Sequence, residues 1–376
     1  GPAGTNGDVI YSLNISPNLE LTGGEFEASA NTFTLTEAQI DAIRERGLYV
    51  NVHSLNFASG ELRGQLLAEA NYYMNAPLSG ASETANVNTN ARGTVILEVT
   101  GNQAIATGGF SGLQSDFNTN VAGGAHIHAG FAGQSGGVIF PLNASVNADN
   151  RSGVFLTGDN TIDMSAGQLD TLRNRMFYVN IHSMDNVPGE IRGQCLPVST
   201  AYLTTSLAGL NEVQPKMTMA NGALKLELNG DVLTATGAFS GLQGDFAANI
   251  AGGAHLHLGS AGTNGNIDIS LVTSASANLR SGVYTAPDNT FTLDQGQIDA
   301  LVNGDYYANI HTTAFASGEL RGQVLPEINF FPTVGEITLP LDGATILIEG
   351  AASTLFQPTW TAGEDANDLV YIWQLA

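Results

Sequence analysis

One long block recurs at a fixed period along this 376-residue chain, and this repetition constrains the fold more than any other feature. The segment YVNVHSLNFASGELRGQ at 49–65 returns as YVNIHSMDNVPGEIRGQ at 178–194 and as YANIHTTAFASGELRGQ at 307–323. Position i thus matches position i+129 both times, without insertion or deletion. A fixed period of this kind indicates tandem copies of one structural unit.

The repeat divides the chain into four segments. Residues 70–198 and 199–328 form complete units, whereas residues 1–69 match only the second half of one. Residues 329–376 fall outside the repeat and predict a few strands of a separate, partial β-sandwich. Both ends therefore resemble cuts through a longer polypeptide. We expect upstream sequence or another copy of the chain to cover residues 1–69, because half a sandwich exposes an inner face and unpaired edges.

Most of each unit alternates apolar and polar residues with period two, which is typical of strands. Gly-Asn at 101–102 and Asn-Gly-Asp at 229–231 predict hairpin turns. One segment per unit has helical spacing instead: 36–47, 165–176 and 294–305. The sequence predicts an all-β protein of tandem antiparallel β-sandwich or barrel repeats, each with one short helix.

Charge excludes some classes of partner. The chain has 35 acidic and 12 basic residues, a formal net charge of −23, and only two lysines. No basic face is available for nucleic acid, and an anionic membrane surface would repel the chain. No run of 18 apolar residues predicts a membrane span. The single cysteine, Cys195, is replaced by Leu66 and Val324 in the other copies, so we expect a buried apolar residue and not a ligand.

The histidines carry the main candidate chemistry. Two pairs have the pattern His-x-His, in GGAHIHAG at 123–130 and GGAHLHLG at 252–259. Side chains at i and i+2 of a strand share one face, about 6.5–7 Å apart, so both imidazoles can reach one ion. A third histidine follows each pair at the same spacing in both complete units. All seven histidines occupy repeat positions, and we predict all seven as metal ligands: His53, His126, His128, His182, His255, His257 and His311.

Two interpretations of the histidines stay open. Three imidazoles would suit a transition ion, with copper or zinc the expected cofactor. Alternatively, the histidines hold loops in place by hydrogen bonds, and duplication has copied them. A fourth metal position could hold water or an aspartate of FSGLQ-x-D, Asp116 or Asp245. We favour solvent-facing or turn positions for these two aspartates.

Other recurring polar residues flank the third histidine. Asn51, Asn180 and Asn309 precede it by two positions, as either second-layer partners of the ligands or cross-strand structural residues. The pairs Glu61/Arg63, Glu190/Arg192 and Glu319/Arg321 also lie two positions apart, and we interpret each as a structural ion pair on one strand face.

These motifs resemble the CHRD domain, a module first described in chordin and common in bacterial secreted proteins. The carrying segments are GGAHIHAGFAGQSGGVIFPL, YVNIHSMDNVPGEIRGQ and their copies, over about 1–328. The resemblance implies a β-rich extracellular module, often in tandem. It maps the family's His-x-His to His126/His128 and His255/His257, and its later histidine to His53, His182 and His311. The tail resembles the start of an Ig-like or fibronectin-like repeat of bacterial surface proteins.

The sequence favours a secreted, non-catalytic repeat protein at the cell surface, a scaffold, fibre or adhesin, with a three-histidine metal site in each repeat. Self-assembly, or continuation into a longer chain, is the expected partnership, with an extracellular-matrix or polysaccharide partner as a further expectation. The alternative is a copper-dependent redox enzyme, since His-x-His plus a further histidine on a β-sandwich resembles the layout of copper/zinc superoxide dismutases. Against it, the chain shows no second cluster for a paired zinc ion.

Overall fold

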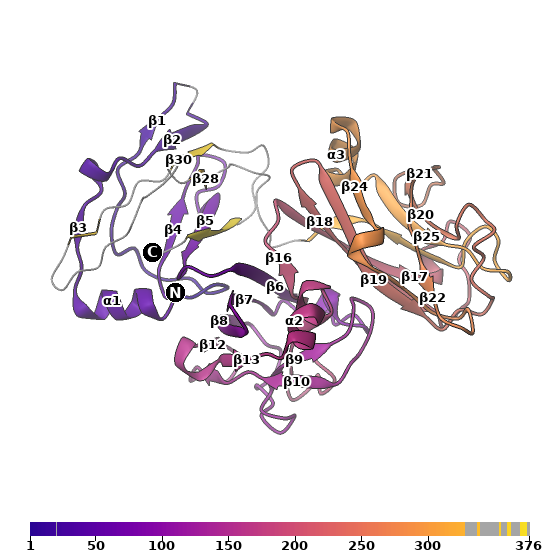
Figure 1. Ribbon diagram of the computed structural model, residues 1–376, viewed down its shortest axis with the longest axis horizontal. Helices are drawn as coiled ribbons and strands as arrows, with labels where there is room; N and C mark the ends of the chain where they lie inside the picture. Colours follow the sequence, from indigo (N-terminus) through magenta and orange to yellow (C-terminus); the bar gives the residue numbers. More distant parts are fainter. Residues whose placement is uncertain (20, 328–336, 339–352, 355–358, 362–368, 374–376) are drawn as a thin grey trace.

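The computed structural model describes residues 1–19, 21–327, 337–338, 353–354, 359–361 and 369–373 (Figure 1). These residues form mostly antiparallel strands with three α-helices and five short 3-10 helices, which confirms the predicted all-β repeats. The 3-10 helices are η1 (Ala28–Ala30), η2 (Gly80–Ser82), η3 (Thr157–Asp159), η4 (Gly209–Asn211) and η5 (Ala286–Asp288).

Each complete unit is one curled eleven-stranded sheet. In the second unit the strand order is β10-β9-β14-β15-β6-β7-β8-β12-β11, with β13 paired to β8 and β16 to β6. The long hairpin β7–β8 closes through a two-residue turn in which Gly101 has φ +61°, a left-handed conformation that glycine adopts without steric cost. The strands are β6 (Tyr72–Ser79), β7 (Arg92–Thr100), β8 (Gln103–Ser111), β9 (Ala125–Ala129), β10 (Val138–Pro141), β11 (Ala144–Val146), β12 (Gly153–Phe155), β13 (Thr161–Asp163), β14 (Phe177–Ile181), β15 (Ile191–Gln194) and β16 (Leu196–Pro197).

The third unit repeats this topology strand for strand, in the order β21-β20-β25-β26-β17-β18-β19-β23-β22, with β24 paired to β19 and β27 to β17. Its strands are β17 (Ala201–Ala208), β18 (Asn221–Asn229), β19 (Val232–Ser240), β20 (Ala254–Leu258), β21 (Asn266–Ser270), β22 (Ser274–Ala275), β23 (Gly282–Tyr284), β24 (Thr290–Thr292), β25 (Tyr306–Ile310), β26 (Leu320–Gln323) and β27 (Leu325–Pro326).

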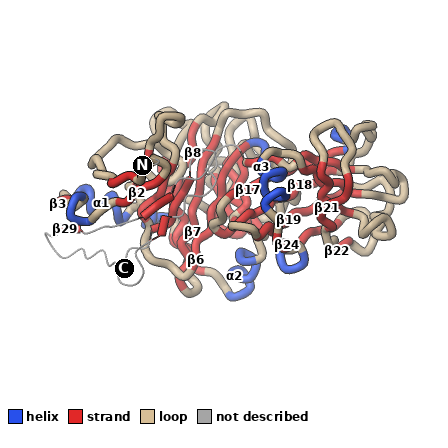
Figure 2. Tube along the Cα trace, turned by 90° about the horizontal axis from the view of Figure 1, so that it is seen from above, coloured by secondary structure: helices blue, strands red, loops and turns tan. Residues whose placement is uncertain are grey.

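The three predicted helices are present and short (Figure 2): α1 (Glu37–Arg44), α2 (Ala166–Arg173) and α3 (Gln295–Val302). Each begins with a capping box, in which the N-cap side chain and a glutamine three residues later satisfy each other's backbone N–H groups. Each also buries an apolar residue, Ile43, Leu172 or Leu301. All three helices end slightly before the predicted position.

Each complete unit has its own apolar core. Phe110 and Phe155 are fully buried in the second unit, and Phe239 and Tyr284 occupy the matching places in the third. Cys195 is fully buried in the core of the second unit, as predicted for an apolar position.

The first half-unit contains β1 (Ser16–Pro17), β2 (Gly23–Glu25), β3 (Phe33–Thr34), β4 (Tyr49–Val52) and β5 (Leu62–Leu66). The described strands of the tail pair with it: β30 (Thr359–Thr361) with β2, β29 (Ser353–Thr354) with β3, and β31 (Leu369–Trp373) with β5 in parallel. β28 (Ile337–Thr338) in turn pairs with β30 (Figure 1).

The tail of the same chain therefore supplies strands to the half-unit, an arrangement that the sequence analysis did not include. The rest of the tail lies outside the described residues, so the Ig-like fold predicted for residues 329–376 stays a prediction.

Candidate metal centre

Two neighbouring strands bring three histidines together in the second unit. β9 carries His126 and His128, and β14 runs beside it with Tyr178 opposite His128 and Asn180 opposite His126. His182 follows β14 directly, and its backbone N–H donates to the carbonyl of Gly124 at 2.9 Å. The period-two geometry of both strands places all three imidazoles on one face of the sheet.

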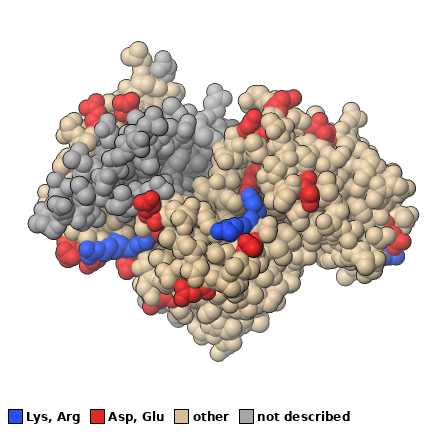
Figure 3. Space-filling model, in the orientation of Figure 1, with Lys and Arg blue, Asp and Glu red and all other residues tan. Residues whose placement is uncertain are grey.

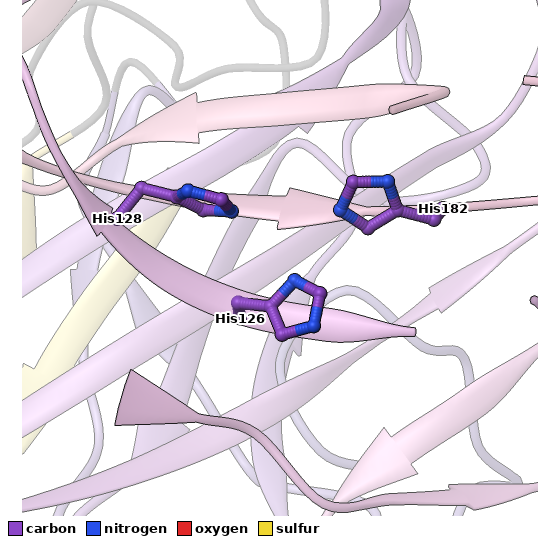
Figure 4. Close-up of side chains that lie close together, drawn as sticks. All are labelled: His126, His128 and His182. Atoms are coloured by element: carbon purple, nitrogen blue, oxygen red, sulfur yellow. The ribbon is translucent and has the colours of Figure 1, made fainter. Parts of the chain in front are cut away.

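The imidazoles converge (Figure 4). The ring centroid of His126 lies 5.5 Å from that of His128 and 5.0 Å from that of His182. One nitrogen from each ring lies within 4.8 Å of the others. Nitrogens bound to a common ion at about 2.0–2.1 Å would be about 3.4–3.6 Å apart, so small ring movements would complete the site.

A backbone carbonyl contacts one nitrogen of each ring, so the other nitrogen faces the space between the three rings. His126 Nε2 lies 2.6 Å from the Ala122 oxygen, and His182 Nδ1 lies 2.8 Å from the Val187 oxygen. His128 Nδ1 lies 3.0 Å from the Gly136 oxygen. Because a carbonyl only accepts, each of these nitrogens carries the ring hydrogen, and a neutral ring then has its lone pair on the other nitrogen.

Those other nitrogens are the ones that meet. His126 Nδ1, His128 Nε2 and His182 Nε2 are buried and have no hydrogen-bond partner within the described part of the chain. A buried acceptor without a partner costs free energy, and here three such acceptors point to one place. A carbonyl on the far ring nitrogen is also the usual second-layer partner of a metal-bound histidine. The donor set therefore fits a metal ion.

The third unit has the same arrangement. The free nitrogens are His255 Nδ1, His257 Nε2 and His311 Nε2, and the oxygens of Ala251, Gly265 and Ala316 hold the opposite ones at 2.6, 3.0 and 2.9 Å. The structure thus contains two histidine triads that could hold a metal ion: His126/His128/His182 and His255/His257/His311.

The glycines before each His-x-His shape the loop that holds the first ring. Gly124 has φ +90° and its α-carbon faces the Phe117 ring, where a β-carbon would lie 2.5 Å from the nearest ring atom. Ala122 has φ +43°, and its copy Ala251 has φ +46°. Alanine rarely adopts this left-handed conformation, which costs about 1 kcal/mol or more. The carbonyl oxygens of these two strained residues, Ala122 and Ala251, contact the rings of His126 and His255.

Burial favours the neutral form of four of these rings. It is the main cause that lowers the pKa of His128 and His257, with bonds to Gly136 and Gly265 opposing it. Burial also lowers the pKa of His311, and it lowers the pKa of His182 to about 4. At neutral pH these four histidines are therefore uncharged, as metal ligands must be.

An aromatic ring and an arginine form a second layer. Tyr178 stacks on His128 at 4.9 Å between ring centroids and 5° between planes, and the Arg192 guanidinium lies 3.4 Å from the centre of the Tyr178 ring. Arg192 also donates to the carbonyls of Gln134 and Phe131, at 2.7 and 3.0 Å. It therefore supports both the ring of His128 and the loop whose Gly136 oxygen orients that ring.

The interpretation of Glu190 and Arg192 as an ion pair is wrong, because each has other partners. Glu190 accepts from the Thr89 hydroxyl at 2.7 Å and the Gln114 backbone at 2.9 Å. Its copy Glu319 accepts from the equivalent Thr218 and Gln243. Because side chains at i and i+2 share a face but lie about 6.5–7 Å apart, nearer groups from adjoining loops bind them first.

Among the described residues, the hydrogen bonds of Asn180 and Asn309 go to loop groups and not to the histidines. Asn180 donates to the carbonyl of Pro188 at 3.4 Å, and Asn309 donates to Glu212 at 3.2 Å. Their neighbours Glu83 and Glu212, with Tyr178 and Tyr307, were not singled out from the sequence. Their recurrence at the period of the repeat was the available signal. Burial raises the pKa of Glu83 to about 7, against the opposing effect of Arg192.

The remaining candidates lie apart from the triads. Asp116 and Asp245 are substantially exposed and pair with Arg151 and Arg280, at 3.8 and 3.0 Å, as expected of solvent-facing residues. His53 keeps the carbonyl contact of its copies, with Nδ1 2.9 Å from the Ala58 oxygen. However, it is exposed and belongs to no triad among the described residues. Its role as a ligand stays a prediction.

Comparison with protein families identifies the repeat. The CHRD domain matches residues 1–66, 74–195 and 203–324, which is most of the chain. Comparison with curated proteins finds no match. Among the described residues, no helix is long and apolar enough to cross a membrane.

Proposed function

Since the chain belongs to the CHRD domain family, we propose that it is a secreted, tandem-repeat structural protein of the cell surface whose complete units each bind one copper or zinc ion. One observation supports the metal site: six buried imidazole nitrogens that have no hydrogen-bond partner among the described residues gather in two groups of three. The net charge of −23 favours cations near the surface (Figure 3). Three imidazole nitrogens suit either ion.

Native mass spectrometry and elemental analysis test the stoichiometry. As a monomer, in which His53 belongs to no triad, the unchanged chain should carry two ions, His128→Ala should carry one, and His128→Ala with His257→Ala should carry none. Each substitution removes one of three ligands, and two imidazoles hold an ion much more weakly. His53→Ala is the matched control, because it removes a ring with the same carbonyl contact but no triad, and it should leave two ions.

Full occupancy in the double variant would refute the ligand assignment. It would favour the other interpretation, in which the histidines only hold loops through the carbonyls of Ala122, Gly136 and Val187.

A copper redox enzyme is the second candidate. Each triad offers three ligands from the protein, so a copper ion there would keep a position for water or a small substrate. A superoxide and peroxide assay of the copper-loaded chain tests it, with the His128→Ala/His257→Ala variant as control. Turnover that disappears in this variant would establish the enzyme, and turnover equal in both would indicate free copper.

Assembly is a further proposal. We propose that, besides the tail strands β29–β31 that pair with residues 1–69, segments of a longer chain or another copy complete this unit and the triad of His53, as in a filament. The exposed side chain of His53 supports this, since its buried copies His182 and His311 each have two histidine neighbours. Light scattering of the purified chain, and of any longer form of it, would show whether either assembles.

A neutral polysaccharide is the matrix partner that we propose. A cleft of about 650 Å³ lies between the second and third units, and no charged side chain lines it. Hydroxyl and amide groups suit sugar hydroxyls, whereas the net charge would repel acidic polymers. A glycan array should show binding to neutral glycans alone; equal binding to acidic ones would argue against the cleft. The lining residues are Thr84, Ala85, Ala129, Gly130, Gly133, Gln134, Ser135, Asn221 and Ser240.

A further inference from the structure

Consecutive units meet through the same contact at both junctions. The loop 130–136 of the second unit lies on the hairpin β18–β19 of the third, so closely that a β-carbon on Gly133 would lie 2.7 Å from the Ala223 nitrogen and 2.8 Å from the Ala238 oxygen. At the first junction, a β-carbon on Gly4 would lie at the same two distances from the Thr94 nitrogen and the Gly109 oxygen of β7–β8. We call this loop and its copies the docking loops: 1–7, 130–136 and 259–265.

An ion pair closes each junction. Arg175 contacts the carboxylate of Glu227 through two nitrogens, at 3.0 and 3.1 Å, and Arg46 contacts Glu98 at 2.7 and 2.8 Å. Both glutamates are 4 % exposed, so the pairs are largely shielded from solvent. A bidentate, shielded contact fixes the orientation of one unit on the next.

The third docking loop is undocked in the described structure. A β-carbon on Gly262 would meet nothing within 4 Å, and Ala261 is exposed, whereas its copies Ala3 and Ala132 are 2 % and 5 % exposed. Gly304 replaces the arginine of the other two units. The chain thus contains docked and undocked versions of one loop.

The docking loop also belongs to the metal centre. The Gly136 oxygen at its end orients His128, and Arg192 holds the carbonyls of Phe131 and Gln134 on either side of Gly133. A single short segment therefore contacts the next unit on one side and positions a histidine on the other.

We propose that docking of the third unit on loop 130–136 strengthens metal binding by the triad of the second unit, and that metal binding strengthens docking in return. This inference rests on the proposed metal site. Docking restricts the loop before the ion arrives, so less conformational entropy is lost on binding. The two effects must be equal, because coupling between two binding equilibria is reciprocal.

The two glycines provide a matched experiment. Gly133→Ala is introduced into a chain that keeps only the second-unit triad, through His255→Ala and His257→Ala. Gly262→Ala is introduced into a chain that keeps only the third-unit triad, through His126→Ala and His128→Ala. Both glycines have φ near +80°, so alanine strains both backbones alike, but only at 133 does it collide with the next unit.

Zinc affinity is measured by competition with a chromophoric chelator. Gly133→Ala should weaken binding about tenfold more than Gly262→Ala does, within the usual range of coupling between sites. Equal effects of the two substitutions would overturn the coupling while leaving the metal sites intact. Failure of both parent chains to bind either zinc or copper would instead overturn the proposed function, and the coupling with it.

Hydrogen exchange gives a second readout that includes the metal-free chain. There, Gly133→Ala should speed exchange in β18–β19, which shows that the junction has loosened. In the chain that keeps only the second-unit triad, zinc should slow exchange in β18–β19 although those strands contribute no ligand. Unchanged exchange on adding saturating zinc would refute the reciprocal effect.

Discussion

At the scale of residues, backbone carbonyls set the orientation of the three imidazole rings in each triad. The spacing of His126 and His128 places two rings on one strand face, which is predictable from period two alone. Their opposite orientations are not predictable: His126 uses Nε2 for its carbonyl contact and His128 uses Nδ1. That difference depends on loops closed by residues distant in the sequence, such as Arg192 on Gln134.

Acid should destabilise the metal-free chain. Histidine in the unfolded chain titrates near 6.5, whereas burial lowers the pKa of His182 to about 4, and it also lowers those of His128, His257 and His311. Between these values the unfolded state binds more protons, so stability is lost as pH falls from about 6.5 towards 4. Thermal unfolding across this range should show the slope, and His182→Gln should reduce it. A slope unchanged by that substitution would mean that other groups cause it.

The buried cysteine should be replaceable. Cys195→Val keeps a small apolar side chain in the core, so the free energy of unfolding should fall by about 1 kcal/mol or less. Urea unfolding measures the change, and the metal content of the same variant should stay at two ions. Loss of an ion would give the thiol a role that its non-recurring position does not suggest.

At the scale of elements, strand β15 and its copy carry an arginine that supports a histidine of the triad through a tyrosine ring. Arg192 stacks on Tyr178 and binds two carbonyls of the docking loop, a geometry that the single ammonium group of lysine cannot reproduce. Arg192→Lys should therefore weaken metal binding in the second unit by about 10–100-fold, as loss of second-layer contacts does elsewhere. Chelator competition should find the third-unit triad unchanged in the same chain. Equal weakening at both sites would point to a general loss of stability.

Helices and hairpins were predictable because their signals are local. Ser165 and Gln168 form the capping box of α2 within one turn, and Gly101 closes a two-residue turn. The pairing of β9 with β14 was not predictable, because four other strands, a 3-10 helix and an α-helix lie between them in the chain and several strands could have been neighbours. The Glu190/Arg192 ion pair was predicted wrongly for the same reason: the residues that bind these side chains lie in other loops, and their proximity cannot be seen in the sequence.

At the scale of the whole molecule, the contacts between consecutive units could not be predicted from the sequence. Arg175 and Glu227 are far apart in the chain, and neither belongs to a recognisable motif. Removing one partner leaves the other charge shielded and unpaired, so Arg175→Ala should lower the free energy of unfolding by about 3 kcal/mol. Arg173→Ala is the control: its pair with Asp170 is exposed and should contribute about 0.5 kcal/mol or less. Calorimetry measures both, and similar losses would show that the junction pair contributes little.

Two junctions that share the glycine contact and the arginine–glutamate pair would impose a similar rotation and translation from each unit to the next. One rigid-body operation applied repeatedly generates a screw axis. An array of such units would therefore follow a superhelix whose pitch is set by the glycine contact and the arginine–glutamate pair. Ions held in the triads would mark this path at regular intervals. Gly304 stands where the other two units have the arginine. A unit docked there would lack the ion pair, so it could adopt a different orientation and the direction of the superhelix could change.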